Sequence, residues 1–216
     1  MALDFNTLKK DGFCIVRGIR ESDLLSIVQP LGQIRMDPRS PEPIRDIQPQ
    51  GAGIAKPNTL SSRYGVGSFP FHTDAAHWER PARYLLLYCV SPGEGIRPTL
   101  LQDSNTWQLN CDEMDLACRA LWAVGNRHAR LSHVAVRSGD QLSIRYDMDC
   151  MRPMTAEARE LQALLASRIQ ATAQKRIDWQ AASLLAIDNH RMLHARGEAQ
   201  RPDASRILKR ILVGDN

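Results

Sequence analysis

The apolar residues of this chain come in many short runs, bounded by glycine, proline and small polar residues. Residues 83–90 form the most continuous of these runs, which is typical of a strand buried on both faces. Shorter runs of the same kind predict further strands. They lie at 12–18, 99–101, 141–147, 176–179, 184–188 and 206–213.

Other segments have helical composition. Ser22 is a suitable N-cap for a short helix, which Pro30 and Gly32 would end. Residues 112–123 and 155–174 are expected to form two longer helices. The second of these is the clearest helix in the sequence.

The order of these elements limits the fold. Many short strands, one long late helix and no regular alternation of strand and helix exclude a doubly wound parallel sheet. The pattern favours a mainly β, α+β protein with two sheets and flanking helices. The whole chain, residues 1–216, is expected to be a single domain, because it is long enough for one sizeable core and short for two. Residues 35–70 are rich in proline, glycine and polar side chains, and we expect a long loop beside the functional site.

Composition narrows the class of protein further. The 43% hydrophobic and 24% charged residues are ordinary for a globular protein. The five cysteines lack a C-x-x-C pair and are irregularly spaced, which argues against a disulfide framework and against zinc held by paired cysteines. The first residues lack a signal-peptide pattern, and no apolar run approaches the length of a membrane span. We therefore expect a cytoplasmic protein with no membrane partner.

The net charge of +4 comes from arginines that are scattered along the chain. A nucleic-acid binding surface would require a basic patch with aromatic side chains among the basic ones. The sequence therefore predicts a small-molecule partner and no nucleic-acid partner.

Candidate chemistry begins with the tripeptide His72-Thr73-Asp74. On an extended strand, His72 and Asp74 would point to the same face. A distant histidine, His194, could complete a site of two histidines and one carboxylate, which is the arrangement that holds non-haem Fe(II) and leaves positions open. The H-x-D pattern is weak by itself and depends on its surroundings.

Two other histidines compete for this role. His77 follows Asp74 closely in an expected turn, where it could line the pocket. His190 and His194 are four residues apart, as in helical zinc sites, but the H-E-x-x-H pattern requires glutamate where this chain has Arg191. A zinc hydrolase is therefore excluded.

Several segments, taken in order, resemble the signature of the taurine dioxygenase-like (TauD/TfdA) family. They are residues 69–74, 81–85, 97–100, 187–196 and 206–210. The resemblance extends from about Gly12 to the C-terminus. It implies a double-stranded β-helix (jelly-roll) core and an oxygenase that depends on Fe(II), 2-oxoglutarate and O2.

The resemblance also implies roles for particular residues. His72, Asp74 and His194 would be the iron ligands. Arg206 would form a salt bridge with the distal carboxylate of 2-oxoglutarate, supported by the hydroxyl of Thr99. A guanidinium suits this role because it is always charged and its planar fork matches a carboxylate.

Arg210 and Arg145 are two further candidates for binding an anion. Arg206 and Arg210 share one face of the expected last strand, which is either a polar outer surface or an anion pocket. The iron motif favours the pocket, and Arg210 would then bind the cosubstrate or an acidic group of the substrate. Arg145 is either a substrate contact or a surface residue of its strand. Three residues flank His194 and are expected either to orient it and hold local turns or to touch substrate: Asn189, Arg191 and Arg196.

The sequence thus predicts a dioxygenase that hydroxylates an unactivated C–H bond of a small polar or anionic metabolite, with release of succinate and CO2. Desaturation and ring closure stay open as outcomes of the same chemistry. The alternative is a non-catalytic jelly-roll domain that binds a metal or senses 2-oxoglutarate. The oligomeric state is open.

Overall fold

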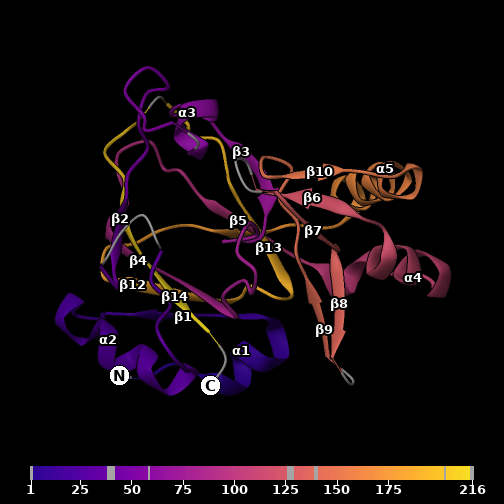
Figure 1. Ribbon diagram of the computed structural model, residues 1–216. Helices are drawn as coiled ribbons and strands as arrows, with labels where there is room; N and C mark the ends of the chain where they lie inside the picture. Colours follow the sequence, from indigo (N-terminus) through magenta and orange to yellow (C-terminus); the bar gives the residue numbers. More distant parts are fainter. Residues whose placement is uncertain are drawn as a thin grey trace.

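The computed structural model describes residues 2–37, 42–57, 59–125, 129–138, 141–201 and 203–214. At the centre of this part of the chain, two antiparallel sheets face each other (Figure 1). The large sheet has the strand order β1 (Phe13–Arg17), β12 (Ser183–Asp188), β4 (Tyr84–Ser91), β14 (Ile207–Val213) and β2 (Arg45–Ile47). The small sheet has the order β11 (Lys175–Ile177), β5 (Thr99–Asp103), β13 (Met192–Arg196) and β3 (Phe69–His72).

The space between the sheets is filled by apolar side chains from both. Leu85 and Leu87 of β4 and Leu185 of β12 point inward from the large sheet. Leu101 and Met192 of the small sheet belong to the same buried cluster. Residues two apart on a strand share a face, so each strand contributes alternate residues to this core. The core holds the two sheets face to face.

The outer face of the large sheet is covered by N-terminal helices (Figure 1). These are α1 (Phe5–Asp11) and α2 (Leu24–Val28), with 3-10 turns at Glu21–Asp23 and Gln29–Leu31. Their apolar side chains pack on the outward positions of β4, β12 and β14. Both faces of β4 are therefore buried, which explains its continuous apolar run.

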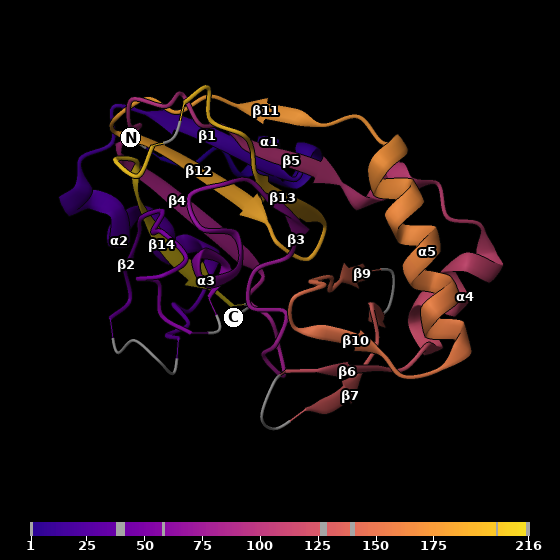
Figure 2. The same ribbon diagram turned by 90° about the horizontal axis from the view of Figure 1, so that it is seen from above.

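A second group of elements packs beside the small sheet, with α4 and α5 side by side (Figure 2). It consists of β6 (Trp122–Val124), β7 (Arg130–Ser132), β8 (Ala135–Ser138), β9 (Gln141–Ile144), β10 (Met151–Pro153), α4 (Cys111–Arg119) and α5 (Ala156–Ala171). Leu193 and Ala195 of β13 belong to its core. Because neighbouring residues of a strand point to opposite faces, His194 between them points the other way.

The expected mainly β fold with flanking helices is confirmed, and every strand predicted from the apolar runs is present. None of the helices in the described residues is long and apolar enough to cross a membrane. All of the cysteines are free, in agreement with the expectation that no disulfide framework exists.

Some boundaries were wrong. The helix expected over 112–123 ends at Arg119, because residues from Trp122 onward pair as a strand between β7 and β10. The expected strand over 141–147 ends at Ile144. Ser22 is not an N-cap, since a 3-10 turn begins before it at Glu21 and the Ser22 hydroxyl donates to the next carboxylate.

The expected long loop over 35–70 contains two short elements, β2 and α3 (Leu60–Tyr64). β2 is the edge strand of the large sheet and pairs with β14. A further 3-10 turn, at Ser104–Trp107, follows β5.

We expect Thr155→Ala to lower the free energy of unfolding by about 1 kcal/mol. Thr155 is the N-cap of α5, and its hydroxyl accepts a hydrogen bond of 3.2 Å from the Ala158 amide. Urea denaturation would measure the loss. Thr172→Ala is the matched control at the C-cap of the same helix, where we expect a change within about 0.5 kcal/mol. An equal loss in both variants would contradict the capping role.

Candidate active site

A cavity of about 1340 Å³ lies between the two sheets and the 35–70 segment. The candidate residues that line it are His72, Thr73, Asp74, His77, Thr99, His194, Arg196, Arg206 and Arg210. Most of the predicted site residues are thus brought together in one place, although they lie far apart in the sequence.

The two candidate histidines lie on neighbouring strands. His194 of β13 is directly opposite His72 of β3 in the register of the small sheet. Their ring centroids are 4.2 Å apart, and both side chains are buried. His72 Nδ1 lies 3.1 Å from the carbonyl oxygen of Pro70, so its Nε2 is the ring nitrogen left for another partner.

Asp74 lies in the turn after β3, since the strand ends at His72. The expectation that both ligands sit within one strand is therefore wrong in detail, while the side chains still face one cavity. Thr73, between the two candidate ligands, is buried. Its amide donates to the Tyr146 carbonyl at 2.7 Å, and its hydroxyl accepts from the Tyr146 amide at 3.1 Å.

Asn189 holds the turn that carries Asp74. Its side-chain oxygen accepts from the Asp74 amide at 2.7 Å, and its side-chain nitrogen donates to the Asp74 carbonyl at 3.0 Å and to the Ala82 carbonyl at 2.9 Å. Asn189 is fully buried. Of the two roles that the sequence left open for it, the structure gives it a positioning role.

The Asp74 carboxylate faces Arg210 of β14. One terminal nitrogen of Arg210 lies 3.0 Å and 3.1 Å from the two carboxylate oxygens. The other terminal nitrogen lies 3.4 Å from Asp37, which also accepts from Arg45 at 3.0 Å. Burial raises the pKa of Asp74, but the nearby Arg210 charge and both histidines outweigh it and lower that pKa to about 2. The carboxylate is therefore ionised at neutral pH.

His194 is a neutral imidazole at neutral pH. Burial, with repulsion from His72, lowers its pKa to about 3, although Asp74 opposes this shift. Its Nδ1 is buried and has no hydrogen-bond partner. A neutral histidine with a buried, unpaired nitrogen is suited to bind a metal ion.

The types of donor at this site suit a metal ion, but their arrangement in this structure does not form a complete metal site. The donors are two histidines and an ionised carboxylate, which suit Fe(II). Among the described residues, however, no group of three or more histidine, cysteine, aspartate or glutamate side chains could hold a metal ion as it stands. Arg210 is the present partner of the Asp74 carboxylate. A metal ion at Asp74 would compete with Arg210 for that carboxylate.

Thr99 and Arg206 lie at another part of the cavity wall. The Thr99 hydroxyl accepts from Trp179 Nε1 at 3.0 Å, which leaves its own proton available for donation. Arg206 is buried and donates to the Arg97 carbonyl at 3.2 Å, while its Nε has no partner. Burial, with repulsion from other arginines, lowers the pKa of Arg206 to about 9. These groups are suited to receive an anion.

The remaining candidates lie elsewhere. Arg145 is buried outside the lining of the cavity, where it donates to the Ser132 hydroxyl at 3.0 Å and to the Glu79 carbonyl at 2.8 Å. The His190 ring contacts the Pro81 carbonyl at 3.2 Å, in a turn instead of a helix, in keeping with the exclusion of a helical zinc site. Arg191 is paired with Asp103.

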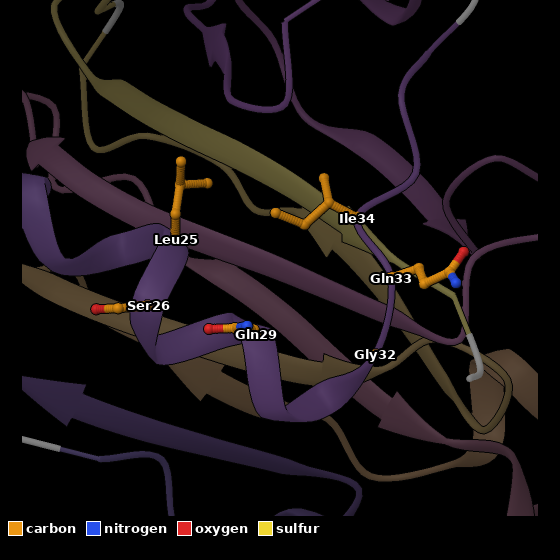
Figure 3. A pocket seen from close by; sticks show the side chains of 6 residues that line it. All are labelled: Leu25, Ser26, Gln29, Gly32, Gln33 and Ile34. Atoms are coloured by element: carbon orange, nitrogen blue, oxygen red, sulfur yellow. The ribbon is translucent and has the colours of Figure 1, made fainter.

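A smaller hollow of about 540 Å³ lies beside α2 (Figure 3). Its lining is Leu25, Ser26, Gln29, Gly32, Gln33 and Ile34. It carries no titratable side chain and therefore offers no candidate chemistry.

Comparisons with known proteins bear on the family resemblance and the fold. The family described as "Taurine catabolism dioxygenase TauD, TfdA family" matches residues 4–96. No curated protein matches the chain.

Solved structures are similar over nearly the whole chain. An asparagine oxygenase in complex with Fe(II), 2S,3S-3-hydroxyasparagine and succinate has a TM-score of 0.76 at 16% identity, over 97% of this chain and 77% of that one. The non-haem iron oxygenase OrfP in complex with Fe and alpha-ketoglutaric acid has a TM-score of 0.77 at 18% identity, over 98% and 78%. PvcB from Pseudomonas aeruginosa has a TM-score of 0.68 at 18% identity, over 97% and 78%.

These likenesses confirm the mainly β, jelly-roll fold. Together with the match of residues 4–96, they confirm the resemblance of this chain to the TauD/TfdA family of oxygenases.

Proposed function

We propose that this chain is a single-domain Fe(II)- and 2-oxoglutarate-dependent dioxygenase, which hydroxylates an unactivated C–H bond of a small polar or anionic metabolite. The observation that carries the proposal is the pairing of His194 with His72 across neighbouring strands, with Asp74 beside them in one cavity. Thr99 and Arg206 line the same cavity, where a dicarboxylic cosubstrate needs a cation.

His72, Asp74 and His194 would hold the iron. When it is bound, iron with 2-oxoglutarate and O2 supplies the oxidising power, and the protein supplies binding, orientation and exclusion of water. The chain prepares its donors for this role. His194 is neutral, Asp74 is ionised, and Asn189 fixes the turn that carries Asp74.

Arg206 would bind the distal carboxylate of 2-oxoglutarate. Its guanidinium is buried and has an unpaired Nε, so an incoming carboxylate would satisfy a group that now has no partner. Thr99 would donate its hydroxyl proton to the same carboxylate, because Trp179 already donates to the hydroxyl oxygen. The reaction would release succinate from this position.

The substrate would lie near Arg210. Once Arg210 is displaced from Asp74 by the metal ion, Asp37 still holds its other nitrogen, and the freed nitrogen can bind an acidic group. The similar asparagine oxygenase and OrfP were solved with hydroxylated amino acids, which supports a polar substrate. Arg145 does not line the cavity, so it has no direct role in this proposal.

The test is the formation of succinate. We expect the purified protein to convert 2-oxoglutarate to succinate in air when Fe(II) is added, slowly without substrate and faster with one member of a panel of amino acids and other small anions. EDTA should stop the reaction, and excess Fe(II) should restore it, because the oxidation requires the metal. Binding of Fe(II) and 2-oxoglutarate with no succinate under any condition would favour the sensing domain instead.

A further inference from the structure

Three buried arginines gather at the end of the cavity that would receive the cosubstrate. They come from different segments: Arg97 precedes β5, Arg196 ends β13 and Arg206 precedes β14. Their exposed fractions are 3%, 4% and 4%, so all three charges are withdrawn from water. Burying a charge is costly unless it is paired.

These arginines have no carboxylate partner among the described residues. Arg97 donates to the carbonyl of Gly197 at 3.0 Å and to that of Val66. Arg196 donates to the carbonyl of Gly65 at 2.7 Å. The Nε atoms of all three arginines are buried and unpaired.

The charges also repel one another. Burial, with repulsion from Arg97, lowers the pKa of Arg196 to about 10. Burial and repulsion from Arg196 and Arg97 likewise lower the pKa of Arg206. Asp203 is the nearby acidic group, but its carboxylate is engaged by the amides of Gly95 and Ser205. The cluster therefore keeps an excess of buried positive charge.

Arg196 and Arg206 both line the cavity, and Arg196 is directly opposite Thr99 in the sheet register. The Arg196 guanidinium carbon lies 4.7 Å from the centre of the Phe69 ring, which fixes its plane. Phe69 in turn contacts the His72 ring at 5.2 Å between centroids. Arg196 thus lies beside both the strand that carries His72 and the strand that carries Thr99.

We propose that Arg196 is a second anion-binding residue of the cosubstrate pocket, and that together with Arg206 it makes the pocket select a dicarboxylate over a monocarboxylate of the same length. This inference rests on the proposed function. Two guanidiniums have more hydrogen-bond donors than the single carboxylate of a monoanion can accept. A dicarboxylate also brings the negative charge that the buried cluster lacks. Arg97 contributes through its charge and does not line the cavity.

The test is a comparison of succinate and butyrate binding by calorimetry with the metal-free protein. We expect Arg196→Gln to weaken succinate binding by about tenfold or more, because a charge-assisted hydrogen bond is lost. Butyrate, a weak ligand of the wild type, should change little. Arg196→Lys keeps the charge and should recover most of the succinate affinity.

Arg176→Gln is the matched control, since Arg176 lies on the edge strand β11 with an exposed ion pair to Asp178. We expect its succinate affinity to equal that of the wild type. A purely structural role for Arg196 would weaken both ligands together, and that result would overturn the inference, as would an Arg196→Gln variant that binds succinate within twofold of the wild type. No succinate binding by the wild type would overturn this inference, while succinate formation with Fe(II) tests the proposed activity separately. Selective succinate binding without succinate formation would overturn the proposed activity alone.

Discussion

Replacement of His72 by alanine is expected to lower succinate formation from 2-oxoglutarate by at least about 100-fold, because residues that merely orient metal ligands are already worth about 10–100-fold. The His72 ring lies 4.2 Å from that of His194, and the Pro70 carbonyl fixes its Nδ1. Its removal would leave one histidine and one carboxylate, which is too few ligands for a stable iron site. Succinate would be quantified by chromatography and Fe(II) affinity by anaerobic calorimetry.

His133→Ala is the matched control for this experiment. His133 contacts the Ala120 carbonyl at 3.2 Å and does not line the cavity. We expect its turnover to stay within twofold of the wild type. His72→Gln fills more of the space left by the ring and shows whether packing causes the loss. If folded His72→Ala and His72→Gln retained a tenth or more of the activity, His72 would not be a ligand.

Part of the small sheet was accessible from the sequence, because the apolar runs at 99–101 and 176–179 predict β5 and β11, whereas β3 and β13 are not among the predicted strands. Leu193 and Ala195 point into the second core and His194 faces the cavity, as alternation along a strand requires. The first helix was not predicted, although its ends carry a recognisable signal. Asp4 accepts from the Thr7 amide at its start, and Gly12 ends it with a positive φ of 79° that glycine adopts readily.

The pairing of Asp74 with Arg210 could not be predicted, because it joins residues 136 positions apart and depends on how the two sheets face each other. From the sequence, Arg210 was expected to bind an anion of the cosubstrate or substrate. In this structure it forms an ion pair with Asp74, a candidate metal ligand. Metal binding and release of Arg210 would then be linked, so the cavity would gain a free cation when the metal arrives.

Contacts between distant segments also decide the position of Arg145 and the structure of the last residues of 112–123, and the local sequence does not reveal them. Arg145 is directed by the Ser132 hydroxyl and the Glu79 carbonyl, which belong to segments whose approach no local pattern reveals. The last residues of 112–123 have helical composition but become strand β6, since pairing with β7 and β10 outweighs weak local propensity.

Asn189→Ala is expected to lower the free energy of unfolding by on the order of 3 kcal/mol, because each buried group left without a partner costs about 1–3 kcal/mol. The variant removes three hydrogen bonds at once, at a position that is fully buried. The groups affected are the Asp74 amide, the Asp74 carbonyl and the Ala82 carbonyl. The same change would release the turn that presents the Asp74 carboxylate.

We therefore expect Asn189→Ala to weaken Fe(II) binding by about 10–100-fold as well, which is the usual effect of losing a group that orients a ligand. Urea denaturation and anaerobic calorimetry would measure the two effects. Asn105→Ala, in an exposed 3-10 turn, is the control and should change stability by less than about 0.5 kcal/mol. A loss of stability with unchanged Fe(II) affinity would mean that Asp74 is positioned by something other than Asn189, or that Asp74 does not bind the metal. Loss of affinity without loss of stability would instead mean that Asn189 acts on the metal site alone, since its three hydrogen bonds would then contribute nothing to folding.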